Sequence, residues 1–296
     1  MESLESLGAR IATTDQIGDI VGTMKALSAV SIRQYERAAD ALGGYDAVIE
    51  SGLQAVLQGA AGIGGQDEDS GRQALVIIGS DRGLCGRFNQ NIVDHGLKTK
   101  LQGENQNQTL IAAVGVRAAA RLEFLGHAPA ATFALPGSVN GLNQSTQDLL
   151  VQLSQWRDRQ DVARIDVVFN RRAAGASARP TRRRLLPIAQ DYLDELVRRP
   201  WPSRGLPMFR MARGQLLSWL LRQYLFVNLY RALVESLASE HASRLAAMQA
   251  ASRNIEERLS DLNAAYRKKR QESITSELLD IVTGFEAASG KGKYAN

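Results

Sequence analysis

The stretch from Gln215 to Thr283 contains neither glycine nor proline, and it constrains the fold more than any other feature of the chain. These two residues destabilise helix interiors most, by about 1 and 3 kcal/mol relative to alanine. Their absence over 69 residues predicts one continuous helix, about 100 Å long at a rise of about 1.5 Å per residue. A helix of this length needs a second helix beside it to bury an apolar seam.

Two sets of residues on this helix have the 4-3-4 spacing of a coiled-coil seam. The first is Ile255, Leu259, Leu262 and Tyr266, and the second, after a slip, is Ile274, Leu278, Ile281 and Phe285.

The other seam of this kind lies at the start of the chain. Its members are Leu4, Leu7, Ile11 and Thr14 and, one step out of phase, Ile17, Ile20, Met24 and Leu27. A phase shift of this kind would alter the supercoil locally. We therefore expect a helix over 1–58, with a break near Gly43-Gly44, to pack antiparallel against a helix over 208–287.

Between these two helices the pattern changes to short apolar strands that alternate with helices. The strands are expected over 74–79, 109–115, 164–170 and 182–188, and the helices over 87–101, 116–125 and 142–157. Alternation of this kind favours a small, mostly parallel, Rossmann-like sheet with helices packed on it. The predicted fold is therefore α/β: an antiparallel coiled coil of the two ends with an α/β domain over 72–200 inserted between them.

Composition excludes several functions. The single cysteine, Cys85, cannot form an internal disulfide, and His95, His127 and His241 lack the spacing of metal ligands. No stretch reaches the roughly 18–20 apolar residues needed to span a bilayer, and the start of the chain does not resemble a signal peptide. We expect a soluble cytoplasmic protein that binds neither a metal nor a cofactor.

Positive charge is concentrated between Arg171 and Arg213. This segment has eleven arginines, no lysine and three acids, whereas the whole chain has a formal charge of +5. Such a segment could meet nucleic acid, anionic lipid or an acidic protein surface, or it could be an arginine-rich, solvated loop and strand edge. A nucleic-acid-binding α/β module with a coiled-coil stalk is therefore the alternative function, although Trp156, Trp201 and Trp219 are not interleaved with basic residues as in a stacking platform.

Three motifs resemble those of the gamma subunits of F-type ATP synthases. The segment from Asp81 to Gly86 reads DRGLCG and follows a predicted strand. The segments 238–248 and 270–284 read ASEHASRLAAM and RQESITSELLDIVTG, and they match family motifs in order, spacing and position near the end of the chain. Asp15, Asp19 and Gly22 stand in a helix that usually carries several lysines, and Leu245 replaces the usual methionine, so we read the chain as a divergent member. An alternative F-type ATPase is one source of such divergence.

The resemblance implies a central rotor shaft and no catalytic residues. Its expected partners are the alpha and beta subunits of the catalytic ring, the epsilon subunit and the membrane c-ring, with no nucleic acid. Through this complex the chain would be a peripheral membrane protein on the cytoplasmic face of the cell membrane. It would couple ion flow through the c-ring to ATP synthesis or hydrolysis on the catalytic ring.

The resemblance also implies which residues contact the catalytic ring. They are Met24, Lys25, Arg244, Arg270, Gln271, Thr275 and Glu277. Taken alone, these polar residues would be ordinary solvated positions on a coiled coil.

The segment Gly83-Leu84-Cys85-Gly86 could be read in three ways. A phosphate-binding loop is disfavoured, because Arg87-Phe88 stand where the lysine and hydroxyl of a P-loop would be. Cys85 as a nucleophile has only His95 as a plausible base. We therefore expect a structural turn in which Gly83 or Gly86 has a positive φ.

Overall fold

The computed structural model describes residues 3–58, 71–101, 109–172, 178–201, 205 and 208–290. The chain divides into two compact units, one formed by Met1–Ala26 with Met248–Asn296 and the other by Leu27–Ala247. This division cuts both long helices, whereas the expected boundaries at 1–58, 72–200 and 208–287 follow changes of secondary structure and stay a prediction. The loop expected before Gly71 lies outside the described residues.

The larger unit contains a five-stranded sheet. Its strands are β1 (Arg72–Ile78), β2 (Leu110–Val114), β3 (Ala131–Phe133), β4 (Val162–Arg172) and β5 (Ala178–Leu186). They are ordered β3-β2-β1-β4-β5, and β5, antiparallel to β4, is the exception in a parallel sheet. The expected mostly parallel sheet is thus confirmed.

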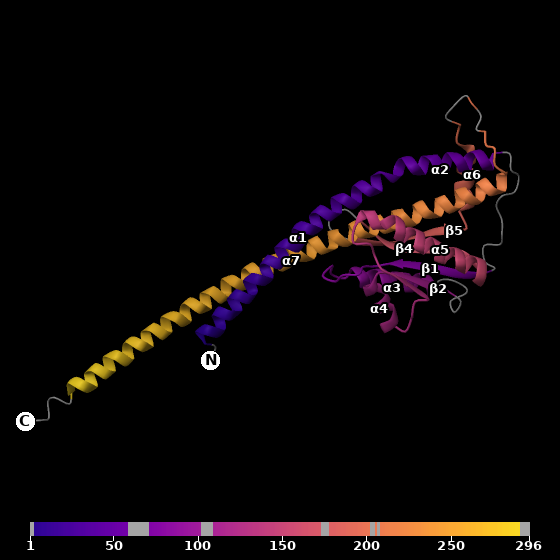
Figure 1. Cartoon of the computed structure of the whole chain (residues 1–296). Helices are drawn as coiled ribbons and strands as arrows, with labels where there is room; N and C mark the ends of the chain where they lie inside the picture. The colour runs from indigo at the N-terminus through magenta and orange to yellow at the C-terminus, as the bar shows by residue number, and fades with distance from the viewer. Residues whose placement is uncertain are drawn as a thin grey trace, which may run out of the picture. The chain divides into compact units, whose positions relative to one another are not determined.

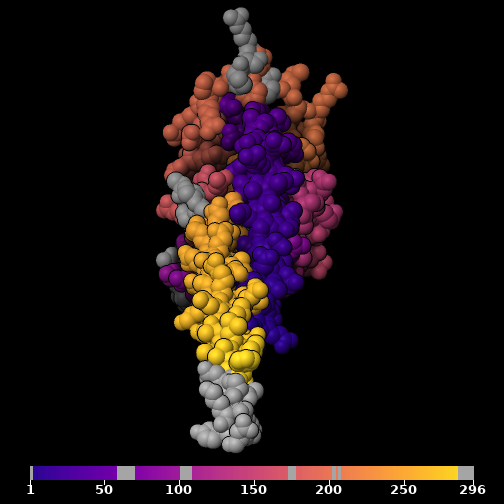
Figure 2. All heavy atoms as spheres, turned by 90° about the vertical axis from the view of Figure 1, so that its left-hand side faces the viewer, coloured from indigo at the N-terminus to yellow at the C-terminus, as the bar shows by residue number. Residues whose placement is uncertain are grey.

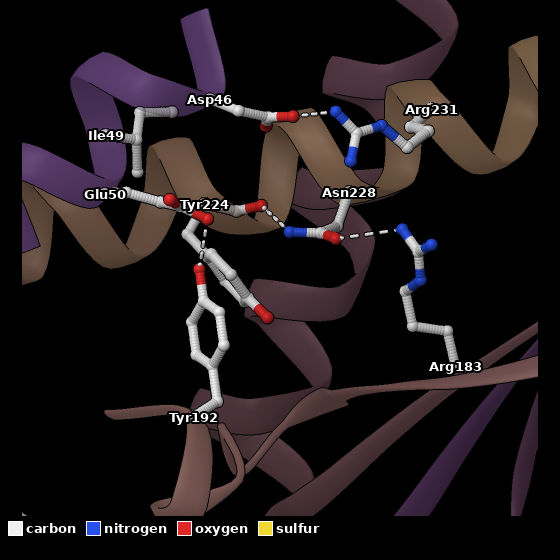
Figure 3. Close-up of a pocket in the computed structure, with 8 residues that line it drawn as sticks. All are labelled: Asp46, Ile49, Glu50, Arg183, Tyr192, Tyr224, Asn228 and Arg231. Carbon is white, nitrogen blue, oxygen red and sulfur yellow. Dashed lines mark hydrogen bonds and ion pairs between the residues drawn. The ribbon is translucent and has the colours of Figure 1, made fainter. Parts of the chain in front are cut away.

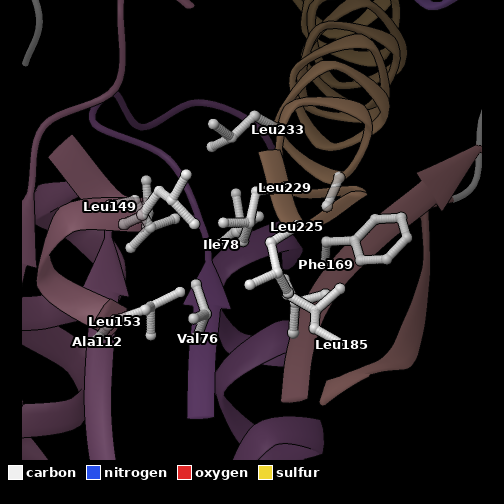
Figure 4. Close-up of a cluster of buried hydrophobic side chains, with 14 of the residues drawn as sticks. Val76, Ile78, Ala112, Leu149, Leu153, Phe169, Leu185, Leu225, Leu229 and Leu233 are labelled. Atoms are coloured by element: carbon white, nitrogen blue, oxygen red, sulfur yellow. The ribbon is translucent and has the colours of Figure 1, made fainter. Parts of the chain in front are cut away.

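Helices cover both faces of this sheet (Figure 1). On one face α3 (Phe88–Leu101) and α4 (Val116–Phe124) pack against Leu75 and Ile77 of β1. On the other face α5 (Leu142–Gln160) and α7 (Arg213–Gly290) pack against the alternate β1 residues Val76 and Ile78. Figure 4 shows Leu225, Leu229 and Leu233 of α7 within this second core. The long C-terminal helix is therefore part of the α/β core from Leu225 to Ala238.

The helices at the two ends of the chain run antiparallel in each unit. In the smaller unit, a Cβ placed on Gly8 of α1 (Leu4–Asp40) would lie 3.9 Å from Tyr266, and one on Gly18 would lie 3.5 Å from Ile255. In the larger unit, Gly52 of α2 (Leu42–Leu57) lies against Leu220. Position numbers rise on one helix as they fall on the other, which confirms the antiparallel coiled coil.

The phase shift expected within the N-terminal seam is wrong. Ile17, Ile20 and Leu27 are 48%, 60% and 63% exposed, whereas Val21 and Ser28 are buried. The residues that face inward fit the 4-3 spacing of the first set, except at the position of the exposed Lys25: Leu7, Ile11, Thr14, Gly18, Val21, Ser28, Ile32 and Tyr35. Small residues occupy several of these positions, and a pattern built on large apolar residues missed them.

The second seam expected on the C-terminal helix is also wrong. Ile274, Leu278, Ile281 and Phe285 are 48–74% exposed, whereas Leu262 of the first seam is buried. The reason is the register of the coiled coil. Helix α1 begins at Leu4, only four residues before the point where it meets Tyr266, so no α1 residue lies opposite α7 beyond about 270. Figure 2 shows the yellow end of α7 continuing past the indigo start of α1.

Other differences concern short elements and boundaries. The helix break expected near Gly43-Gly44 is present, at Ala41 between α1 and α2. Strand β3 and helix α6 (Gln190–Arg198) were not expected. Among the described residues no helix is long and apolar enough to cross a membrane.

Candidate functional site: a clamped turn and an exposed helix end

The turn after β1 is held by side chains at the carboxyl end of that strand. The Asn89 side chain accepts from the Ser80 amide at 2.9 Å and donates to the Ser80 hydroxyl at 2.7 Å. Gly86 has a φ of +61°, as expected, but the second residue with positive φ is Leu84 (+61°) and not Gly83. A leucine in this region is uncommon, so the surrounding contacts must hold the turn in place.

Asp81 ties this turn to two neighbouring segments. Its carboxylate accepts from the amide of Val116 at the start of α4 and from the amide of Leu135 after β3, each at 2.9 Å. A carboxylate at a helix N-terminus is stabilised by unpaired amides and by the helix dipole. The first residue of the DRGLCG motif is therefore a structural connector.

Cys85 lies inside the turn and is 3% exposed. Burial raises the pKa of its thiol, with contacts to Ser80 and charges of Arg244 acting in the opposite direction. A nucleophilic cysteine needs a lowered pKa and access to a substrate. The environment thus supports the structural reading of Gly83, Leu84, Cys85 and Gly86.

Arg244 of α7 clamps this turn from the other side. Its guanidinium donates to the carbonyl of Gly83 at 3.3 Å and to that of Arg82 at 3.4 Å, and it forms an ion pair with Glu240. Both charged side chains are 6% exposed. Within the chain, Arg244 supplies the cation that the buried Glu240 requires. Its expected contact with the catalytic ring stays a prediction.

An aromatic stack extends this cluster to α1. The rings of Tyr35 and His241 are stacked with centroids 5.6 Å apart. Burial, together with the charges of Arg244 and Arg82, lowers the pKa of His241 to about 4, so the imidazole is neutral at physiological pH. Burial also raises the pKa of Glu240, against the effect of Arg244. The turn, α7 and α1 thus meet in one buried polar cluster.

The second candidate is the C-terminal end of α7, where large apolar side chains face solvent. They are Ile274, Leu278, Leu279, Ile281, Val282 and Phe285. The residues expected to contact a ring lie on the same stretch: Arg270, Gln271, Thr275 and Glu277 are all exposed. Side-chain bonds on this stretch are local, such as that from the Thr275 hydroxyl to the Gln271 carbonyl at 2.8 Å. Both classes of side chain are available to another molecule.

The two remaining predicted contact residues lie on α1. Met24 is half-buried and Lys25 is exposed. Ile17 and Ile20, which were expected in the seam, are exposed on the same helix.

Several arginines of the basic segment are bound to acids of the chain itself. Arg182 pairs with the fully buried Asp166, and Arg171 with Glu235. Arg172 pairs with Glu36, and Arg199 with Glu50. Arginines that already form ion pairs within the chain are poorly placed to bind phosphates, which counts against the nucleic-acid alternative.

A polar cavity of about 310 Å³ lies among α2, α6, α7 and β5 (Figure 3). Tyr192 donates to Glu50 at 2.8 Å, and Arg183 donates to Asn228 at 3.2 Å. An Asp46–Arg231 ion pair closes one side. Most polar groups are used in bonds between elements, so the cavity is a junction that fastens α2 and α6 to α7.

The sequence pattern missed the residues that support the turn. Asn89, Glu240 and the connecting role of Asp81 depend on segments that are distant in the chain. Glu240 had one available signal, because it lies four residues before Arg244 on a helix, the spacing of an ion pair.

Comparison with known proteins identifies relatives over nearly the whole chain. A family model described as ATP synthase matches residues 3–288. The ATP synthase gamma chain of Granulibacter bethesdensis is 31% identical over 97% of this chain and all of its own length. That of Geotalea daltonii is 28% identical over 98% of this chain, again over all of its own length.

Solved structures show the same fold. A chain from the Euglena gracilis mitochondrial ATP synthase, in a structure of its OSCP, F1 and c-ring, has a TM-score of 0.69 and 19% identity, and the match covers 99% of this chain and 96% of that one. A chain from the central stalk and c-ring of the Tetrahymena thermophila mitochondrial ATP synthase has a TM-score of 0.58 and 22% identity, over 79% of this chain and 99% of that one.

Proposed function

The chain belongs to the family of ATP synthase gamma chains, the central rotor shafts of F-type ATP synthases, and we propose that it couples rotation to ATP chemistry through contacts alone, with no catalytic site of its own. The observation that carries this proposal is the exposed end of α7. Six large apolar side chains face solvent there, between Ile274 and Phe285. A continuous exposed apolar surface marks a site of interaction, because leaving it in water costs about 25 cal/mol per Å².

The polar residues at the start of this surface give the contact its specificity. Arg270 and Gln271 can donate hydrogen bonds, and Glu277 can accept them. Together with Met24 and Lys25 on α1, they are the proposed contacts with loops of the alpha and beta subunits. Arg244, which also holds the turn after β1, stays a proposed member of this set.

The proposed mechanism is differential contact. Rotation presents different faces of α7 to each catalytic subunit in turn, and each face favours one conformation of that subunit by its contact free energy. Contacts with the epsilon subunit and with the c-ring of the membrane sector connect the chain to ion flow. The chain is then a peripheral component on the cytoplasmic face of the cell membrane.

Alanine substitution at Arg270 and Gln271 tests this proposal. Each variant is assembled with the alpha and beta subunits, and ATP turnover is measured per assembled complex. Loss of a desolvated hydrogen bond across an interface costs about 1–3 kcal/mol, so assembly or turnover should fall about 5- to 150-fold. Helicity and thermal unfolding of the isolated chain should stay unchanged, because both residues are exposed and alanine is the best helix former.

The matched control is Arg258→Ala, at another exposed position on α7. It should leave both assembly and turnover close to those of the unsubstituted chain. The contact assignment fails if Arg270→Ala and Gln271→Ala unfold the isolated chain while turnover per complex is unchanged.

A further inference from the structure

His241 of α7 lies between a ring of α1 and the guanidinium that clamps the turn after β1. Its imidazole stacks on the ring of Tyr35, with the centroids 5.6 Å apart and the planes 20° apart. Its Nδ1 atom lies 3.5 Å from a terminal guanidinium nitrogen of Arg244. Tyr35 and Arg244 are both buried, so the two partners of the imidazole are held in place by the fold.

The contact with Arg244 depends on the protonation state of His241. A guanidinium has only donors, so Nδ1 can bind it only as an acceptor, which requires that this atom carries no proton. With a proton on Nδ1, a donor would face a donor and a cation would face a cation. The hydrogen bond therefore exists only when His241 is neutral.

The charged groups around His241 balance one another while the imidazole is neutral. Two cations and two carboxylates come from the turn and from α7, whereas the phenol from α1 and the thiol from the turn are uncharged because burial raises the pKa of each. A proton on His241 would leave this buried cluster with one uncompensated positive charge, which burial penalises. The charged groups are Arg82 and Asp81 of the turn and Glu240 and Arg244 of α7, and the uncharged groups are Tyr35 and Cys85.

We propose that His241 positions Arg244 and makes the clamp on the turn after β1 sensitive to acid. Neutral His241 holds the guanidinium against the carbonyls of Arg82 and Gly83, and a proton on His241 releases it. This role within the chain goes beyond the coupling proposed above. Release would also free the guanidinium that the proposed function assigns to the catalytic ring, and that consequence rests on the proposed function.

The direction of the effect follows from the two forms of the clamp. Burial and the charges of Arg244 and Arg82 lower the pKa of His241 to about 4 in the closed form, whereas an imidazole in water has a pKa of about 6.5. The open form thus binds a proton that the closed form excludes, and the clamp opens as the pH falls from about 6.5 toward about 4. Between pH 7.5 and pH 5 these two pKa values raise the opening equilibrium about 25-fold.

Glu240 acts in the opposite direction. Burial raises the pKa of its carboxyl, against the effect of Arg244, so the closed form holds a proton on Glu240 more readily than the open form does. The effect of His241 must therefore be measured against a variant in which Glu240 is kept.

Thiol labelling of the isolated full-length chain tests the proposal. Cys85 is the single cysteine and is 3% exposed inside the clamped turn, so its reaction with dithiodipyridine reports opening. At each pH the labelling rate is divided by the rate for the chain unfolded in urea, which removes the pH dependence of the reagent and of an accessible thiol. This ratio should rise about 25-fold between pH 7.5 and pH 5.

His241→Gln is the matched variant, because its amide oxygen can accept from Arg244 but does not take up a proton. The ratio for this variant should change less than about threefold over the same pH range. His127→Gln, at a position after α4, should keep the full rise. An equal rise in His241→Gln, or no rise in the unsubstituted chain, overturns the proposal.

A second measurement needs no change at residue 241. His95→Gln combined with His127→Gln leaves His241 as the only histidine, and its NMR ring signals in the full-length chain then follow its protonation. A midpoint below about pH 5 supports the proposal, and one near the ordinary value of about 6.5 contradicts it. Both measurements use the isolated chain, so their failure is distinct from unchanged ATP turnover in the ring-contact variants, which would contradict the proposed function.

Discussion

Arg244 is a buried, charged residue that connects α7 to the turn after β1. Its guanidinium neutralises Glu240 and donates to two carbonyls of the turn after β1, all in a region from which water is almost excluded. A buried ion pair contributes little net stability over apolar residues, but removing one partner leaves an uncompensated charge. Family resemblance pointed to Arg244 as a contact of the ring, and the structure adds its contacts with Glu240 and with the turn after β1.

We predict that Arg244→Ala destabilises the full-length chain by about 3–5 kcal/mol, because Glu240 is left buried without its cation. Urea unfolding followed by circular dichroism measures this change. Arg244→Ala combined with Glu240→Ala should recover part of the loss, since the charge itself is then removed. Arg258→Ala, at an exposed position, should change stability by less than about 0.5 kcal/mol. A loss below about 1 kcal/mol for Arg244→Ala would show that the clamp is not a structural element.

Helices α1 and α2 carry glycines in three different settings. A Cβ on Gly22 would have no atom within 4 Å, and one on Gly18 would make only an ordinary contact with Ile255. A Cβ on Gly52 would lie 2.7 Å from the buried Leu220. Only at Gly52 does close packing of the two helices depend on the missing side chain.

We therefore predict opposite effects for two alanine substitutions. Gly22→Ala should stabilise the chain by about 1 kcal/mol, since alanine is the better helix former and meets nothing. Gly52→Ala should instead destabilise the chain by about 1–3 kcal/mol, because Leu220 has to leave its packed position. Thermal unfolding of both variants, side by side, makes the comparison. A stabilising Gly52→Ala would mean that Leu220 moves freely.

For the whole molecule, the strand order reverses between β1 and β4, and other α/β proteins bind nucleotides beside the carboxyl ends of their strands at such a point. Here the neighbouring turn lacks a P-loop lysine, and Arg244 of α7 donates to its carbonyls. Among the described residues no group of three or more histidine, cysteine, aspartate or glutamate side chains could hold a metal ion. A side chain of the long helix thus bonds to the carbonyls of this turn.

The corresponding prediction is that the purified chain does not hydrolyse ATP. Turnover is measured across the fractions of a gel-filtration column loaded with the isolated chain. Arg87 stands where a P-loop would have its lysine. Activity that follows the chain through the column and disappears in Arg87→Ala would contradict the proposed non-catalytic role.

The local sequence by itself determined the helices and strands that have a periodic or continuous apolar pattern. The glycine- and proline-free stretch led to α7, and its seam from Ile255 to Tyr266 faces α1 as expected. The run from Ala74 to Ile78 led to a strand buried on both faces. These predictions held because helix periodicity and continuous apolar runs depend on residues that are neighbours in the chain.

Tertiary structure alone decided where the seam ends and what the polar residues contact. Ile274 to Phe285 have the spacing of a seam, but α1 starts too late in the register to cover them. Ile17 and Ile20 look like core residues, yet Gly18 and Val21 take the inner positions, because these lie on the side of α1 that faces α7. Arg244 reads as a surface residue until the turn that follows β1 is folded against it. Each outcome depends on which distant segment of the chain packs against the residue. The physical reason is that a side chain is buried or paired only when a second surface lies against it, and the local sequence describes only the first surface.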